Sequence, residues 1–150
     1  MDYLGKIIIA FELHSASEIA ECFDHGIDPN QMHEGKPLIH QLINMYSRGP
    51  MFRECVRVFA DRGLEFEDRP LLSVLLNDAN SLQEQLNTDK AILTRKYTFD
   101  CTFTPLLEAS LLHICAEYNH LACAEVLVKN GMDVPGVYYL YVILIVALAF

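Results

Sequence analysis

The sequence predicts an all-α solenoid of about four helix-turn-helix repeats, joined by loops or short hairpins. Three observations predict it. Apolar residues recur at the spacing of one helix face in paired short segments, and residues that tolerate a left-handed backbone follow many of these segments. Proline and glycine positions also recur along the chain. Two antiparallel helices this short cannot bury their apolar faces alone, so each pair needs neighbouring copies.

The clearest helix pair is Ser110–Val134. Asn119-His120 interrupts the helical period in its middle, and asparagine tolerates the left-handed conformation that ends helices. Asn130-Gly131 closes the second helix, where a residue with positive φ is wanted. The apolar positions on either side of the break follow helical spacing: Leu112, Cys115, Ala116, Cys123, Ala124, Leu127 and Val128.

This stretch resembles an ankyrin repeat, whose pattern runs roughly T-P-L-H-x-A-A-x-x-G-H, then a second helix, then G-A-D-V-N. Residues 112–116 (LHICA) and Asn119-His120 stand where L-H-x-A-A and G-H fall in that family. Gly131–Val134 stands where G-A-D-V falls, and Ser110-Leu111 replaces Thr-Pro. The resemblance implies a protein-interaction module without catalysis. It also implies that His113 braces the helix ends by hydrogen bonding.

The resemblance extends more weakly over residues 4–135 and divides them into units on a common period. Pro37 opens the second unit and Pro70 the third, 33 residues later, because proline suits the first position of a helix. The second helix of the second unit carries apolar residues at helical spacing: Phe52, Cys55, Val56 and Phe59. The predicted boundaries are 1–33, 34–66, 67–103 and 104–136, followed by a hydrophobic tail at 137–150.

The start of the last unit has two competing registers. Thr104-Pro105 is the better match to Thr-Pro, and Pro105 follows Pro70 by 35 residues. The spacing from Pro105 to Gly131 is 26 residues, the same as from Pro37 to Gly63. We therefore place the start at Thr104-Pro105 and expect a first helix or helical turn about six residues longer than usual in both units.

Composition narrows the classes of partner and the compartment. The formal charge is −9, with 20 acidic and 11 basic residues, which argues against a nucleic-acid partner because phosphate backbones need a basic stripe. The cysteine count of five is odd and no CxxC pair occurs, so we expect reduced core cysteines in a cytoplasmic protein. An unidentified protein partner is expected, and a small-molecule substrate is not.

Motifs for catalysis, cofactors and metals are weak. His113, Cys115, His120 and Cys123 give HxC and HxxC spacings, but zinc needs four converging ligands and both cysteines fit apolar helix positions. The acids near loops are expected to be solvated, since nothing marks a pocket that would shift their pKa values; they are Asp24, Glu65, Glu67 and Asp68. No Gly-rich phosphate loop or G-x-S-x-G motif occurs, so neither an enzyme nor a cofactor is expected.

The stretch 93–103 is the candidate partner-binding site. It carries aromatic and basic side chains in what should be a loop or hairpin at the edge of the stack, where repeat proteins bind partners. The alternative is that these aromatics fold back onto neighbouring helices. The candidate residues are Arg95, Lys96, Tyr97, Phe99 and Phe103.

The tail at 137–150 is uncharged and almost wholly apolar. As a helix it would span about 21 Å, short of the roughly 30 Å hydrocarbon core of a bilayer. It can be a cover for the apolar end of the stack, a short membrane anchor, or a strand that pairs with another chain. The anchor alternative makes the protein a membrane-tethered adaptor or immunity-type protein, and the membrane its second partner.

Overall fold

The computed structural model describes residues 2–101, 103 and 105–133. Within these ranges the chain forms eight α-helices, one 3-10 helix and two two-stranded sheets. This mostly helical content confirms the predicted all-α class, with two small sheets added. All three alternatives for the tail at 137–150 concern residues outside the described ranges. In the part of the chain that is described, no helix is both long and apolar enough to cross a membrane.

The chain divides into two compact units, and the division does not follow the sequence in a simple way. The described residues of unit 1 fall within 1–67 and 99–106, and those of unit 2 within 68–98 and from 107 onward. The chain therefore leaves unit 2 after Thr98 and returns to it at Leu107. No finding tests the four predicted boundaries themselves, which stay a prediction.

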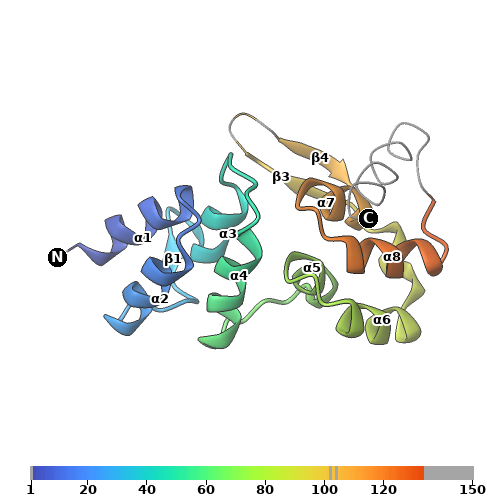
Figure 1. Cartoon of the computed structure of the whole chain (residues 1–150), viewed down its shortest axis with the longest axis horizontal. Helices are drawn as coiled ribbons and strands as arrows, with labels where there is room; N and C mark the ends of the chain where they lie inside the picture. The colour runs from blue at the N-terminus through green and yellow to red at the C-terminus, as the bar shows by residue number, and fades with distance from the viewer. Residues whose placement is uncertain (1, 102, 104, 134–150) are drawn as a thin grey trace. The chain divides into compact units, whose positions relative to one another are not determined.

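Unit 1 consists of two helix pairs with a short hairpin between them (Figure 1). Helix α1 contacts both α2 and α3, and α2 contacts α4. The hairpin strands are antiparallel, with Met32 opposite Pro37. The elements are α1 (Tyr3–Glu12), α2 (Ala16–Asp24), β1 (Met32–His33), β2 (Lys36–Pro37), α3 (Leu38–Ile43) and α4 (Phe52–Asp61).

Unit 2 also consists of two helix pairs, with a longer connection between the pairs (Figure 1). Helix α5 contacts α6 and α7, while α6 contacts α8. Strands β3 (Tyr97–Phe99) and β4 (Leu106–Ala109) pair within that connection, and of their residues 97–98 and 107–109 belong to unit 2. The helices are α5 (Arg69–Leu75), α6 (Ala79–Thr88), η1 (Lys90–Thr94), α7 (Leu111–Glu117) and α8 (Leu121–Lys129).

The predicted apolar faces form the cores of the two units. In unit 1, Phe59 of α4 meets Phe11 and Phe23 at ring-centroid distances of 5.8 and 4.9 Å. The four apolar positions predicted for the helix at 52–61 are all buried. In unit 2, Leu75, Leu82 and Leu86 are fully buried between the helices. Each fully buried leucine of this kind contributes on the order of 2 kcal/mol.

The turn inside a helix pair has the same form in three of the four pairs. His14, Asn77 and Asn119 each take a left-handed backbone, with φ of 48°, 53° and 55°. The N–H of the following residue then donates to the carbonyl five residues earlier, at 2.8 to 2.9 Å in all three cases. This geometry satisfies carbonyls that the end of a helix leaves without a partner. The predicted turns at Asn77-Asp78 and Asn119-His120 are thereby confirmed.

Glycines end the second helices as predicted. Gly26, Gly63 and Gly131 follow α2, α4 and α8, and their φ values are 95°, 85° and 94°. A side chain would meet nothing within 4 Å at any of the three, so their backbone conformation is the reason for glycine.

The expectation of longer first helices is wrong in both units. Helix α7 begins at Leu111, and Pro105 stands before strand β4. Glu108 adopts a left-handed backbone with φ 51°, which interrupts any helix, and the Ser110 side chain then caps α7. In the second unit α3 has six residues and ends at Ile43, well before the helix-breaking Gly49-Pro50.

Candidate functional site

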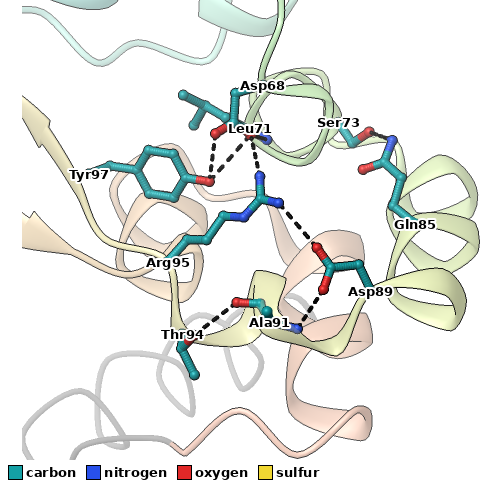
Figure 2. Close-up of polar contacts among 9 residues, drawn as sticks. All are labelled: Asp68, Leu71, Ser73, Gln85, Asp89, Ala91, Thr94, Arg95 and Tyr97. Atoms are coloured by element: carbon teal, nitrogen blue, oxygen red, sulfur yellow. Dashed lines mark hydrogen bonds and ion pairs between the residues drawn. The ribbon is translucent and has the colours of Figure 1, made fainter.

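Four side chains of unit 2 form a polar network, which we name the Arg95 cluster: Asp68, Asp89, Arg95 and Tyr97 (Figure 2). Arg95 lies between two carboxylates, with Nη1 3.6 Å from Asp68 Oδ1 and Nη2 3.2 Å from Asp89 Oδ2. The Tyr97 hydroxyl donates to Asp68 Oδ2 at 3.1 Å. The cluster thus joins the start of α5 to the segment that follows α6.

Both carboxylates of the cluster also cap helices. Asp68 accepts from the Leu71 N–H at 2.9 Å, at the start of α5. Asp89 accepts from the Ala91 N–H at 2.9 Å, at the start of η1. An acidic side chain before a helix is favourable because it satisfies a free N–H and meets the positive end of the helix dipole. These local preferences hold the two acids in place, and Arg95 is positioned between them.

The surroundings of Tyr97 raise the pKa of its phenol. Burial, followed by the negative charge of Asp68, raises the pKa of Tyr97 well above its ordinary value. A phenol in this state donates a hydrogen bond and does not act as a base at neutral pH. The hydrogen bonds and ion pairs of the cluster therefore hold the start of α5 against the segment after α6, and the phenol is not suited to proton transfer.

A shallow pocket of about 420 Å³ lies beside the cluster. Its lining combines apolar, acidic, basic, hydroxyl and amide side chains, contributed by α5, α6, η1 and the residues directly before and after η1. The lining residues are Pro70, Glu84, Gln85, Thr88, Asp89, Ile92 and Arg95. We refer to it below as the α6–η1 pocket.

Gln85 is the one amide in the wall of this pocket. Its Nε2 donates to Ser73 Oγ at 3.1 Å, which fastens α6 to α5 (Figure 2). Its Oε1 is buried and has no hydrogen-bond partner among the described residues. A buried acceptor without a donor costs about 1–3 kcal/mol, so the wall of the pocket holds an unmet hydrogen bond.

The five predicted partner-binding residues fall into different environments. Arg95 and Tyr97 are half-buried in the Arg95 cluster, while Lys96 between them is exposed. Phe99 is only 5% exposed. The alternative that the aromatics fold back thus holds for Phe99, which is buried, while Arg95 and Tyr97 bind Asp68. The partner-binding role of the five residues stays a prediction.

Phe103 remains exposed, at 77%. It belongs to unit 1, where its ring meets that of Tyr46 edge-on at 6.0 Å, and Tyr46 is itself 50% exposed. Cys101 fixes the chain nearby, because its Sγ accepts from Arg48 Nη2 at 3.2 Å and donates to the Ile43 carbonyl at 3.8 Å. Phe103 and Tyr46 thus form an exposed aromatic pair in unit 1.

The residues with zinc-like spacing have structural contacts. Ser110 and His113 form a reciprocal cap, with Ser110 Oγ 2.6 Å from His113 Nδ1 and the Ser110 N–H donating to the same nitrogen. His120 Nδ1 lies 2.6 Å from the Val74 carbonyl. Burial raises the pKa of the Cys123 thiol to about 12. Among the residues that the structure places, no group of three or more His, Cys, Asp or Glu side chains is arranged to hold a metal ion.

The α6–η1 pocket could hardly be predicted from the sequence. Its lining residues follow no motif, and Ile92 lies in a 3-10 turn that the polar composition of residues 87–103 did not predict. The acidic residues Glu84 and Asp89 five positions apart were the one local signal.

Compared with protein-family models, curated proteins and solved structures, the chain matches none of them. Function therefore has to be inferred from the geometry of the chain itself.

Proposed function

We propose that the protein is a cytoplasmic protein–protein interaction module, built as an ankyrin-like array and without catalytic activity. One observation carries the proposal. In each unit the first helices of the two pairs pack against each other, and the second helices do the same. First helices meet in the contacts α1–α3 and α5–α7, and second helices meet in α2–α4 and α6–α8. Stacked helix pairs of this kind bury a continuous core and offer a rigid outer surface for partners.

The recurring turns support the same proposal. Three pairs share one left-handed turn and three end in a left-handed glycine, which is the pattern that a recurring helix-turn-helix unit would produce. The reciprocal contact between Ser110 and His113 has the form expected for the bracing histidine of the ankyrin pattern. The longer connection before α7 is a departure from that pattern.

The exposed aromatic pair is the surface we propose for partner contact. Aromatic side chains are enriched among residues that dominate binding energy, and the side chains of Phe103 and Tyr46 are both exposed. Lys96, exposed in unit 2, is a second contact candidate. An anchor of this type typically contributes 2 kcal/mol or more to binding.

Affinity capture with the full chain tests the proposal. Proteins retained from a cell extract by the wild type are compared with those retained by Phe103→Ala. Leu13→Ala is the matched control, because Leu13 lies in the same unit and is 69% exposed. We expect a partner that the wild type and Leu13→Ala retain and Phe103→Ala loses. Capture of no specific partner by the wild type overturns the proposed function, and equal capture by all three overturns the role of Phe103.

A membrane-tethered adaptor is the second candidate function. It is favoured by the sequence of the 137–150 segment, which has no charged residue. Deleting residues 137–150 should move such a protein from the membrane fraction to the soluble fraction. Unchanged fractionation would remove this candidate.

A further inference from the structure

The α6–η1 pocket has no role in the proposed packing of repeats, yet its chemistry is specific. Pro70 and Ile92 supply apolar surface, and Ile92 is buried. Three of the other lining side chains are charged: Glu84, Asp89 and Arg95. Pockets that combine an apolar lining with a few placed polar groups are typical ligand sites.

The charges around the pocket favour a cation. Arg95 brings one positive charge, but Asp68 and Asp89 both lie within 4 Å of its guanidinium nitrogens. Glu84 adds a carboxylate that is exposed and has no ion-pair partner among the described residues. Lys90, the nearest lysine in sequence, is held away by Asn130, whose Oδ1 accepts from its Nζ at 2.6 Å. Asp68 and Asp89 thus outnumber the guanidinium they contact, and Glu84 adds a third carboxylate to the lining, so the local charge is negative.

Gln85, one of the lining residues, also has a hydrogen-bond acceptor without a donor. Gln85 Oε1 is buried without a donor, and rotation of the amide would only exchange the unmet carbonyl for an unmet N–H. Because this oxygen has almost no accessible surface, a donor in the pocket reaches it only when the Gln85 side chain turns, and the cost of the unmet carbonyl is then relieved.

From these features we propose that the α6–η1 pocket binds a lysine side chain of a protein partner. The aliphatic stem lies along Pro70 and Ile92, and the ammonium group meets Glu84 and Asp89. Long basic side chains bind in this way, with the stem on apolar surface and the charged head among polar groups. An ammonium has three donors, so it can serve both carboxylates and the Gln85 carbonyl. This inference rests on the proposed interaction function and names one contact of the partner.

The first test uses the full chain, labelled with ¹⁵N, and a minimal probe. Nα-acetyl-lysine methylamide is titrated into the protein while the amide shifts of α6 and η1 are followed. Nα-acetyl-norleucine methylamide is the matched neutral probe, since it has the same stem without the ammonium. We expect saturable shifts for the lysine probe, weaker binding for the norleucine probe, and a loss of affinity in 0.5 M salt. Equal binding of the two probes, or no saturable shift, overturns the proposal.

A pair of variants locates the site. Glu84→Gln removes an exposed charge that makes no described ion pair, so the fold should persist. We expect it to weaken the lysine probe about two- to fivefold, the range of an exposed charge pair. Glu125→Gln on α8 is the control, because Glu125 is exposed and does not line the pocket. Equal affinity of the wild type and Glu84→Gln overturns the site.

The outcomes separate this inference from the proposed function. Capture of a partner that Glu84→Gln retains in full, together with failure of the lysine probe, sinks the pocket and leaves the interaction module standing. Binding of the lysine probe without any captured partner overturns the interaction module and leaves the pocket as a binding site for a lysine side chain.

Discussion

Removing the Tyr97 hydroxyl should reveal how strongly the Arg95 cluster stabilises unit 2. Tyr97→Phe deletes the hydrogen bonding of the hydroxyl to the Asp68 carboxylate, whose Oδ2 and Oδ1 it meets at 3.1 and 3.3 Å, and leaves the ring in place. Hydrogen bonds to charged groups contribute about 1.5–3 kcal/mol. Since Asp68 is about a third exposed, we expect the lower end, a loss of about 1.5 kcal/mol in the free energy of unfolding.

Asp68→Ala should cost more, because that carboxylate does three things. It caps α5, which is worth about 1 kcal/mol. It accepts from Tyr97, and it lies 3.6 Å from Arg95 in an exposed pair worth about 0–1 kcal/mol. We expect a total loss of about 3 kcal/mol. The double variant should cost about the same as Asp68→Ala alone, since the hydroxyl then has no carboxylate to meet.

Urea denaturation followed by circular dichroism measures all four proteins of this cycle. The expected coupling energy between Tyr97 and Asp68 is about 1–1.5 kcal/mol. Tyr3→Phe in unit 1 is the control and should lie within about 0.5 kcal/mol of the wild type, because the Tyr3 ring stacks on His25 and the ring is unchanged. Losses that add to within about 0.3 kcal/mol would refute the reasoning, since the two groups would then act independently.

Three further predictions concern turns, protons and thiols. Gly131→Ala should destabilise by about 1–2 kcal/mol in thermal melts, because alanine must take φ 94°, whereas Asn119→Gly should be nearly neutral; equal effects would contradict this. Burial lowers the pKa of His14 below 6.5 in the folded state. As the pH falls, the unfolded state therefore binds the proton first. The contribution of neutral His14 to the free energy of unfolding is present above pH 6.5 and is lost below it. His14→Asn, which tolerates the left-handed turn, should therefore flatten the fall in urea midpoint between pH 7.5 and 5.5; an unchanged slope would exclude His14 as a source. All five cysteines are buried, and burial raises the pKa of the Cys55 thiol to about 11. A thiol reagent at pH 8 should therefore label the cysteines rapidly only after denaturation. Fast labelling of the native protein would contradict their burial.

The helix pairs could be predicted from the sequence because their determinants are local. The spacing of Phe52, Cys55, Val56 and Phe59 fixes one face of α4, and all four are buried. Asn119 and Gly131 mark turns because few residues accept a left-handed backbone. Such features depend on a few neighbouring residues, and the sequence displays them directly.

The start of α7 could not be predicted in the same way. Thr104-Pro105 fits the opening motif better than Ser110-Leu111, but a helix starts where its free N–H groups are best satisfied. Ser110 provides that cap together with His113, three positions later. Two sequence signals six residues apart competed, and the cap geometry decided between them.

The candidate site could not be predicted from the sequence, for a different reason. Residues 93–103 displayed aromatic and basic side chains, but nothing in them indicated that Asp68, 29 positions before Tyr97, would engage two of them. The α6–η1 pocket likewise depends on packing between segments. Contacts of this kind depend on tertiary structure, which periodicity and motifs do not encode.

The path of the chain between the two units has a consequence for anyone who dissects the protein. The described residues between 99 and 106 belong to unit 1, although they follow the thirty-one residues 68–98 of unit 2 in the sequence. No single peptide bond can therefore be cut to give two fragments that each carry a whole unit. A fragment ending at Glu67 would lack Cys101, whose Sγ donates to the Ile43 carbonyl, and a fragment beginning at Asp68 would carry that segment without its unit. A continuous piece that keeps unit 1 whole must run at least to residue 106, and it therefore also carries the thirty-one residues 68–98 of unit 2.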